Sequence, residues 1–270
     1  MCGIVGKLSL HAPPEPCDVR RAGDALRRRG PDDEGFWAEG PVAFAHRRLA
    51  ILDLSPAGHQ PMLSADGRFV LVLNGEVYNY QELREQMPAP TGGWKSDSDT
   101  EVILAAYARW GAECLRHFRG MFALAIWDRQ EQTLFVARDR MGVKPLYYHH
   151  AGGCFGFSSR PGALFALHPE LSATVDEQAL RLYFEAGYVP APYSFWQQIR
   201  KLRPAHYLLV SASGLKEVRY WDYRQIEPEA SWQSRPEGEL LDELDEIVFR
   251  SVQSRLVSHE IGRASCRERV

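Results

Sequence analysis

The sequence lacks the features that mark membrane, secreted and nucleic-acid-binding proteins. No apolar run approaches the roughly 18 residues that a membrane span needs. The first residues, Met-Cys-Gly-Ile-Val-Gly-Lys, contain no basic segment followed by the long apolar stretch of a secretory signal. A formal charge of −3 offers no electrostatic attraction to nucleic acid or to an anionic membrane. These absences predict a cytoplasmic protein that binds neither nucleic acid nor a membrane.

Cysteine is also scarce. The 270 residues contain five cysteines, an odd and widely scattered set without a C-x-x-C pair. A disulfide framework and a zinc site are therefore both poorly supported, and we predict no metal site. A reducing cytoplasm suits this usage. Hydrophobic residues make up 45% of the chain, which is ample for a core, and the length permits one large domain or two ordinary ones.

Short apolar runs bounded by turn signals dominate the first two hundred residues. The runs at 69–73, 122–126 and 134–137 are typical of strands buried on both faces. The apolar segments 146–148 and 155–157 flank a Gly-Gly pair, which predicts a hairpin turn.

Two segments carry helical signals, each opening at an aspartate. Residues 99–110 have apolar residues at three-and-four spacing, and residues 176–185 repeat the pattern with one apolar face formed by Leu180, Tyr183 and Phe184. Strands that pair with one another and are then covered by helices indicate a layered α+β protein rather than a βαβ array.

The C-terminal part has a different organisation. Residues 224–237 are polar, contain two prolines and show no periodicity, so we interpret them as a linker after a domain at 1–223. Apolar residues then recur at helical spacing from Leu240 to Leu256, which predicts an amphipathic helix that opens a second unit at 238–259. The pattern stops beyond Ser258, and residues 260–270 continue no stripe.

Cys2 is the first candidate for chemistry. Because residue 2 is small, removal of Met1 by an aminopeptidase would leave Cys2 with a free α-amine. The reference pKa of that amine is roughly 7.7–8 and that of the thiol is ~8.5, so one residue would carry a nucleophile and a base near neutrality. On Cys2 alone, a buried cysteine early in the first strand remains the favoured interpretation.

Asn74 and Gly75 follow the apolar run at 69–73. Asn-Gly after a strand usually forms a tight turn, and taken alone this interpretation is favoured. The functional alternative is an oxyanion hole, in which the side-chain amide of Asn74 and the backbone N–H of Gly75 point at one spot.

Three charged residues complete a candidate site. Arg48 lies in a polar stretch that is normally solvated, but an inward-pointing guanidinium could hold a carboxylate with two hydrogen bonds. Asp99 suits a helix N-terminus, but together with Glu76 it could hold an ammonium group. One cation and two anions beside a cysteine nucleophile suit a free α-amino acid.

These residues lie in collinear motifs that resemble the class II glutamine amidotransferases, and within them the glutamine-hydrolysing asparagine synthetases. The resemblance covers about residues 1–258 and includes the later stretches 187–192 and 220–221. Its main motifs are Met1-Cys2-Gly3-Ile4-Val5-Gly6, Arg29-Gly30-Pro31-Asp32-Asp33-Glu34-Gly35, residues 46–53, Asn74-Gly75-Glu76-Val77-Tyr78-Asn79, Ser98-Asp99-Thr100-Glu101, Arg119-Gly120-Met121-Phe122-Ala123 and residues 138–148.

The resemblance implies a four-layer αββα sandwich of the N-terminal-nucleophile (Ntn) hydrolase type, followed by the first helix of an incomplete α/β domain. It implies that Cys2 attacks the side-chain amide of glutamine with its α-amine as base, and that a γ-glutamyl thioester forms. The remaining site residues would be Asn74 and Gly75 at the oxyanion, Arg48 at the α-carboxylate, Glu76 and Asp99 at the α-ammonium, and Leu49, Ile51 and Leu52 lining the pocket.

The resemblance also implies that ammonia is channelled to a synthetase domain, where ATP and Mg²⁺ would activate aspartate. We expect no cofactor for glutamine hydrolysis itself, and a homodimer is compatible with the family. Two departures from the family pattern are Arg28, where the family usually has histidine, and Arg160 after Ser158-Ser159, which we expect to alter a loop near the domain boundary. We further expect that residues 260–270 are not natural protein, because they match the translation of a sequencing adapter, and that the synthetase half is absent.

Other interpretations remain open. A related amidotransferase could make glucosamine 6-phosphate or phosphoribosylamine, and the ammonia acceptor could be a molecule other than aspartate. A non-catalytic module of the same fold is the alternative from another class, and the intact set of site residues argues against it.

Overall fold

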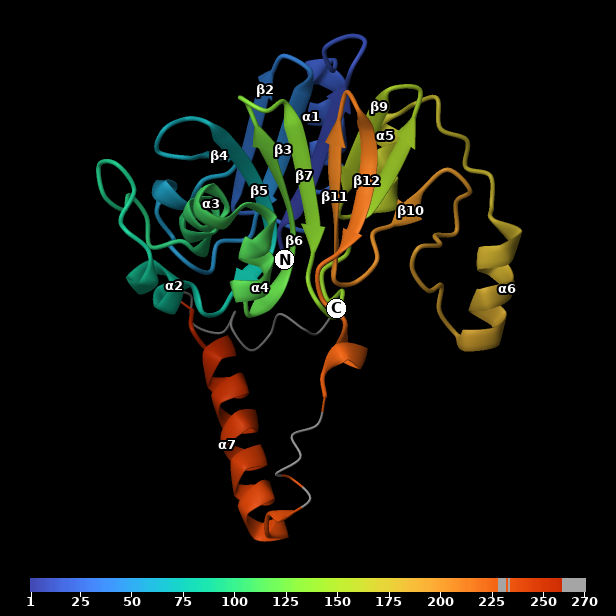
Figure 1. The fold of residues 1–270 in the computed structure, drawn as a ribbon. Helices are drawn as coiled ribbons and strands as arrows, with labels where there is room; N and C mark the ends of the chain where they lie inside the picture. Colours follow the sequence, from blue (N-terminus) through green and yellow to red (C-terminus); the bar gives the residue numbers. More distant parts are fainter. Residues whose placement is uncertain (228–231, 233, 259–270) are drawn as a thin grey trace.

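The computed structural model describes residues 1–227, 232 and 234–258, and it places two six-stranded sheets face to face (Figure 1). One sheet has the order β10-β8-β9-β1-β3-β2 and the other β12-β11-β7-β6-β5-β4. The first sheet comprises β1 (Gly3–Ser9), β2 (Asp33–Glu39), β3 (Val42–Arg48), β8 (Tyr147–Ala151), β9 (Cys154–Ser158) and β10 (Arg200–Lys201). The second comprises β4 (Met62–Leu63), β5 (Phe69–Val77), β6 (Gly120–Asp128), β7 (Thr133–Arg138), β11 (His206–Ser211) and β12 (Gly214–Arg219).

Helices cover the outer faces of both sheets (Figure 1). The first sheet is covered by α1 (Pro16–Asp24) and α5 (Pro161–Leu167), and the second by α2 (Tyr80–Gln86), α3 (Asp99–Trp110) and α4 (Cys114–His117). Short 3₁₀ turns occur at η1 (Pro56–Gly58), η2 (Gly111–Glu113) and η3 (Tyr223–Gln225).

Three separate apolar cores correspond to the three interfaces of this stack. One core lies between the sheets, one between the first sheet and α1 and α5, and one between the second sheet and α2, α3 and α4. All strand pairs are antiparallel. The predicted α+β class and four-layer αββα sandwich are therefore confirmed.

The continuous apolar runs of the sequence are divided between two cores by the period of the strand. In β5, Leu71 and Leu73 belong to the core under the helices, whereas Val70 and Val72 belong to the core between the sheets. Successive side chains of a strand point to opposite faces, so a strand covered on both sides needs apolar residues at every position.

One strand runs further than predicted. The Asn74-Gly75 pair does not form a turn, because β5 continues through it and pairs Asn74 with Ala123 and Gly75 with Phe122 of β6. At Gly75 a Cβ atom would lie 2.2 Å from the carbonyl oxygen of Met121. Glycine is thus required by the close approach of β6 and not by a turn.

Two helices lie outside the four layers. The predicted helix at 176–185 is observed as α6 (Glu177–Ala186), and Asp176 caps it by accepting a hydrogen bond from Ala179 N. Its predicted apolar face is not part of a core, since only Ala179 is buried and Phe184 is 77% exposed. The helix stands at the side of the molecule, where neither sheet covers this face (Figure 1).

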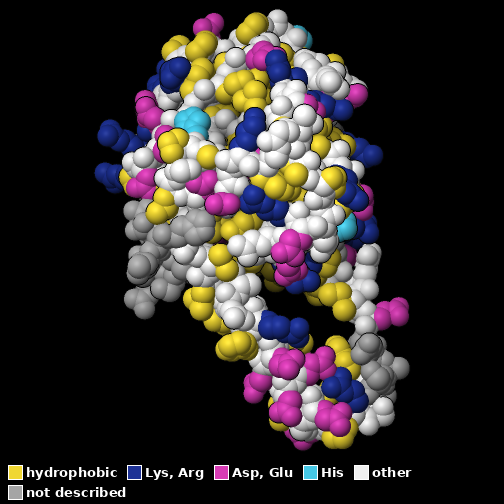
Figure 2. All heavy atoms as spheres, turned by 90° about the vertical axis from the view of Figure 1, so that its left-hand side faces the viewer, with side chains coloured by type: hydrophobic (Ala, Val, Ile, Leu, Met, Phe, Trp, Pro, Cys, Tyr) yellow, Lys and Arg dark blue, Asp and Glu magenta, His cyan; other side chains and the backbone are white. Residues whose placement is uncertain are grey.

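The predicted second amphipathic helix is α7 (Glu237–Arg255), which projects from one end of the sandwich (Figures 1 and 2). Its apolar stripe is exposed, with Leu244 54% and Phe249 68% exposed. Most of the predicted linker is described, but residues 228–231, 233 and the predicted non-natural tail at 260–270 lie outside the described residues. In the described part of the chain, no helix combines the length and the apolar character needed to cross a bilayer.

Candidate active site

The layer between the two sheets becomes polar at one end. Alternation along β3 places His46 and Arg48 on the same face as Phe44, which belongs to the inter-sheet core. Alternation along β5 likewise places Asn74 and Glu76 on the face of Val72. A small pocket lies at this end, lined by Cys2, Arg48, Leu52, Gly58, Gln60, Leu73, Gly75, Glu76, Ser98, Asp99 and Thr100.

Cys2 enters this pocket directly before β1 begins. Its Sγ accepts a hydrogen bond from Leu49 N at 3.4 Å and lies 3.7 Å from Leu49 O. The Nε of Arg29 donates to the carbonyl oxygen of Cys2 at 2.9 Å. Burial lowers the pKa of Arg29, and the nearby charge of Arg160 lowers it further. Arg29 was not among the predicted site residues, although it stands in a motif of the resemblance.

Asn74 is buried without hydrogen bonds to the described protein. Its side chain is fully buried, and neither Nδ2 nor Oδ1 has a partner within the described residues. An unsatisfied buried amide costs about 1–3 kcal/mol, so such a group needs an explanation. Asn74 is not one of the residues that line the pocket, but it precedes Gly75, which is. The role of Asn74 as an oxyanion donor therefore stays a prediction.

The backbone of Gly75 faces the same pocket. Phe122, opposite Gly75 on β6, directs its own N–H and carbonyl group to Asp139, so the Gly75 pair is not hydrogen-bonded across the sheet. The N–H groups of Leu73 and Val77 point to the other edge of β5, where they donate to Gln60 Oε1 and Asp99 Oδ2. By the same alternation, the N–H of Gly75 points to the edge of β5 away from β6, between the N–H groups of Leu73 and Val77.

Arg48 holds the loop that follows β3. Its NH1 donates to Ser55 O at 3.1 Å and its NH2 to Leu52 O at 3.2 Å and to Asp53 O. The side chain is 6% exposed and packs against Gly58, where a Cβ atom would lie 2.0 Å from Arg48 NH2. The predicted inward-pointing guanidinium is present, and it is fixed by backbone carbonyl groups.

Glu76 and Asp99 both line the pocket. Both are buried, with 7% and 4% exposure. Asp99 is the first residue of α3, Ser98 is the N-cap, and Asp99 Oδ2 accepts from Val77 N at 2.9 Å. The structure thus brings together one cation and two carboxylates beside Cys2, at positions compatible with a zwitterion.

The structure separates the three predicted apolar pocket residues. Leu52 lines the pocket, whereas Leu49 contacts Cys2 through its backbone and Ile51 is 2% exposed without lining the pocket. Prediction from the sequence missed Gln60 and Thr100, whose side chains are joined by a 3.2 Å hydrogen bond. Only Thr100 stands in a recognised motif.

His46 links the two sheets next to the site. Its Nε2 lies 3.0 Å from Leu73 O, and because a carbonyl group can only accept, Nε2 carries the proton of the neutral ring. Burial lowers its pKa from 6.5 to about 4, so the ring is neutral at pH 7. Within the described residues no cluster of three or more metal-ligating side chains is found.

Arg160, one of the two departures from the family pattern, lies close to this region. It affects the pKa of Arg29, and Ser159 before it exchanges hydrogen bonds with the backbone of Ile4. Arg160 follows β9, whose Ser158 pairs with Val5 of β1, and it is the N-cap residue of α5. The expectation that Arg160 alters a loop near the domain boundary stays a prediction.

A family model described as a glutamine amidotransferase domain matches residues 1–221. The chain belongs to this family. This chain is 39% identical over 227 residues to asparagine synthetase 3 of Bacillus subtilis, and the match covers 82% of this chain and 37% of that protein. It is 33% identical over 279 residues to a putative asparagine synthetase of Methanocaldococcus jannaschii, covering 96% of this chain and 53% of that protein. It thus spans between about a third and a half of these relatives.

A solved structure has the same fold. The glutamine phosphoribosylpyrophosphate amidotransferase of Bacillus subtilis aligns with a TM-score of 0.61 and 19% identity, over 82% of this chain and 49% of that one. The identification as a class II glutamine amidotransferase, and thus as an enzyme, is confirmed. The roles of individual site residues remain predictions.

Proposed function

We propose that this chain hydrolyses the side-chain amide of glutamine through a thioester on Cys2. The observation that carries the proposal is the single pocket that joins the Cys2 thiol, the Gly75 edge of β5, Arg48 and the Glu76–Asp99 pair. In the proposed cycle, removal of Met1 frees the α-amine of Cys2, which accepts the thiol proton. The thiolate then attacks the amide carbon.

The tetrahedral intermediate places negative charge on the former amide oxygen. Asn74 Nδ2 and Gly75 N–H are the donors proposed to stabilise it. As the carbon–nitrogen bond breaks, the α-ammonium returns a proton to the leaving group and ammonia departs. Water activated by the same amine then cleaves the γ-glutamyl thioester, which releases glutamate and restores the thiol.

Recognition of glutamine is proposed to use the charges of the pocket. The guanidinium of Arg48 would bind the α-carboxylate, and Glu76 and Asp99 would bind the α-ammonium, with Leu52 against the aliphatic part. The arrangement supports these roles, because Arg48 of β3, Glu76 of β5 and Asp99 of α3 all line the pocket that contains Cys2. Glutamine hydrolysis needs no cofactor in this scheme.

The released ammonia is proposed to serve the synthesis of asparagine from aspartate, with ATP and Mg²⁺ bound by a synthetase domain. Support comes from the relatives, whose names include asparagine synthetases from bacteria and an archaeon. A different acceptor is the second candidate, since a relative at 33% identity from Gibberella zeae is named amidase chry2.

Incubation of the protein with glutamine tests the proposal, with ammonia as the measured product. We expect ammonia release that Cys2→Ala abolishes and that the matched change Cys154→Ala leaves intact, since Cys154 lies on β9 outside the pocket. Release of ammonia that does not depend on Cys2 would contradict the thioester. Mass spectrometry that finds Met1 in active material would exclude the α-amine as base.

A further inference from the structure

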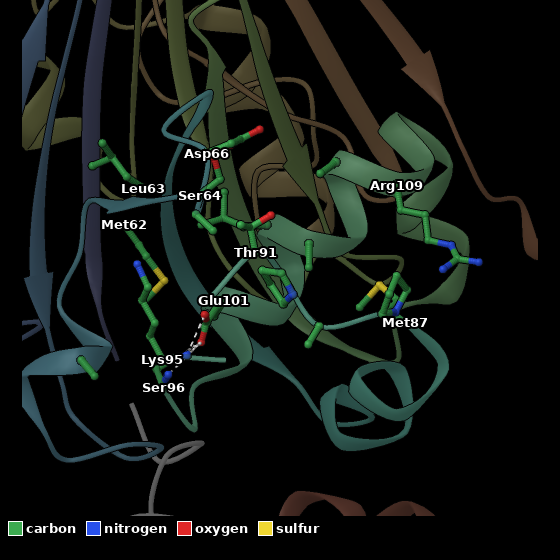
Figure 3. A pocket seen from close by; sticks show the side chains of 18 residues that line it. Met62, Leu63, Ser64, Asp66, Met87, Thr91, Lys95, Ser96, Glu101 and Arg109 are labelled. Atoms are coloured by element: carbon green, nitrogen blue, oxygen red, sulfur yellow. Dashed lines mark hydrogen bonds between the residues drawn. The ribbon is translucent and has the colours of Figure 1, made fainter. Parts of the chain in front are cut away.

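A second cavity, distinct from the glutamine pocket, lies between α3 and the loops at 64–66 and 87–96 (Figure 3). Its volume is about 700 Å³. That size falls in the range of roughly 300–1,000 Å³ that is typical of small-molecule sites. No step of glutamine hydrolysis uses it.

The wall of this cavity is mainly apolar. Met62 comes from β4, Met87 from the end of α2, and Leu104, Ala105 and Ala108 from one face of α3. The prolines of the 87–91 segment complete this wall. Methionine is adaptable and polarizable, so the surface suits a flexible apolar or aromatic body.

The carboxylates around the cavity have hydrogen-bond partners in the protein, whereas the cations form no ion pair with any described residue. Glu101 accepts hydrogen bonds from the N–H groups of Lys95 and Ser96 and from the Ser96 hydroxyl, and Asp66 accepts from Ser64 Oγ and Arg68 N. Both carboxylate oxygens of Glu101 and the Oδ1 of Asp66 therefore have partners in the protein. In the described part of the chain, the side chains of Lys95 and Arg109 form no ion pair.

Lys95 is the cation that a ligand would meet. Figure 3 shows its side chain extending along the cavity wall toward Met62, whereas Arg109 points outward at the other side. An apolar chamber with one available ammonium group at its wall is complementary to a molecule with an apolar body and a single negative charge.

We propose that this cavity binds a small amphipathic carboxylate, with its aliphatic or aromatic body against Met62, Met87 and α3 and its carboxylate at Lys95. The cavity also shares two loops with the glutamine pocket. Ala57 and Ser96 line the former, and their near neighbours Gly58 and Ser98 line the latter.

Octanoate is a suitable probe, and the methionines report its position. In the full chain labelled with ¹³C at the methionine methyl groups, octanoate should shift the Met62 and Met87 signals. Met121 and Met141, which do not line the cavity, serve as internal references. Shifts confined to other methionines, or none at millimolar octanoate, would overturn the proposal.

The carboxylate contact is tested separately. Lys95→Gln should weaken octanoate binding roughly tenfold, because a charge-assisted hydrogen bond is lost. Lys216→Gln, on the exposed face of β12, should change nothing. Octanol, which lacks the charge, should bind roughly as weakly to the native protein as octanoate binds to Lys95→Gln. Equal binding of octanoate and octanol to the native protein would contradict the role of Lys95.

A different set of contacts supports a second proposal, which concerns Asp53 and rests on the proposed function. Asp53 has a left-handed backbone with φ 49° and is 7% exposed. Its carbonyl oxygen accepts from Arg48, while its carboxylate accepts from Ser55 N and Oγ and, at 2.9 Å, from Asp97 N. Burial alone would raise the pKa of Asp53, but the hydrogen bonds from Ser55 and Asp97 lower it below its usual range.

Asp53 therefore joins the two sides of the charged pocket. Arg48 and its loop lie on one side, and Asp97 leads directly into Ser98 and Asp99 on the other. We propose that Asp53 is a positioning residue, which sets the spacing between the groups that bind the carboxylate and the ammonium of glutamine.

Asp53→Asn is the informative variant, because asparagine tolerates the left-handed backbone while it removes the charge and part of the hydrogen-bonding capacity. We expect the KM for glutamine to rise roughly tenfold with kcat within about twofold, since substrate binding and not the chemical step depends on this spacing. Asp66→Asn is a matched control, as Asp66 likewise accepts from a serine hydroxyl and a backbone N–H, with two hydrogen bonds outside the glutamine pocket.

The rate of Cys2 alkylation by iodoacetamide should be the same in the native protein and in Asp53→Asn. Unchanged kinetics in Asp53→Asn, or an equal loss in kcat, would exclude the positioning role. Native protein without any Cys2-dependent ammonia would instead refute the proposed function itself, so the two failures are distinguishable.

Discussion

The two ends of the layer between the sheets are built from the same strands and have opposite character. At one end, Phe44 of β3 and Val72 of β5 are fully buried in an apolar core. At the other end, two residues further along each strand, His46 and Asn74 are equally buried but each keeps at least one unpartnered polar atom within the described residues. The apolar end stabilises the fold by burial, whereas buried polar atoms without hydrogen bonds in the described protein lower stability at the polar end.

The largest effect is expected at the apolar end. Phe44→Ala removes a fully buried ring whose centroid lies 5.8 Å from that of Phe157 and 5.9 Å from that of Trp37. We expect a loss of about 3–5 kcal/mol in the free energy of unfolding, because a cavity is left between rigid sheets. Urea unfolding measures it, and a loss below about 1 kcal/mol would show that the sheets can close over the gap.

Asn74→Ala should lower activity without lowering stability. We expect kcat for glutamine hydrolysis to fall about 10²–10³-fold, equivalent to about 2.7–4 kcal/mol of transition-state stabilisation. Stability should not fall, because the change removes a buried amide without hydrogen bonds in the described protein. The experiment compares kcat with the urea midpoint. A less stable variant with full kcat would assign Asn74 to the fold.

His46 should make stability depend on pH. Its folded pKa of about 4 lies below 6.5, so the unfolded chain binds more protons between these values, and stability falls as pH decreases from 6.5 toward 4. The loss attributable to His46 should reach roughly 3 kcal/mol. His168, whose pKa is also lowered by burial, contributes in the same direction.

The comparison that isolates His46 is urea unfolding of native protein and His46→Gln at pH 7 and pH 5. Glutamine can keep the hydrogen bond to Leu73 O but does not titrate. The native protein should lose more stability between the two pH values. Parallel losses would mean that His46 is protonated in the folded state or that other groups dominate.

The smallest effect is expected on α7, where apolar residues lie outside any core. Leu244 is 54% exposed, so Leu244→Gln should change the free energy of unfolding by no more than about 0.5 kcal/mol. The contrast with Phe44→Ala tests whether burial, rather than apolar character, carries the stability. A loss similar to that of Phe44→Ala would place this part of α7 against a surface.

Much of the fold could be predicted from the sequence because it follows from local patterns. The run at 134–137 and its neighbours became strands, since only a strand covered on both faces needs apolar residues at every position. The helices opening at Asp99 and Asp176 began where predicted, because an acidic or capping residue is favoured at a helix start whatever the tertiary context.

The candidate site was predictable to a different extent. The motifs identified Cys2, Arg48, Glu76 and Asp99, and the structure brings these four into one pocket. The role of Gln60 was not predictable, because it depends on a contact with Leu73 of β5 that no local sequence pattern indicates. The Gln60 side chain accepts a hydrogen bond from Leu73 N, at a point of β5 that lies beyond the two residues paired with β4.

By itself, the sequence determined the order of strands and helices, the two-faced burial of the strands and the residue types available for chemistry, because these depend on period, capping and composition. Only the tertiary structure decided that Asn74 and Gly75 lie within a strand and not in a turn. That outcome depends on pairing with β6, almost fifty residues away. Its physical reason is that β6 approaches Gly75 too closely for any side chain and leaves the Gly75 N–H facing the pocket.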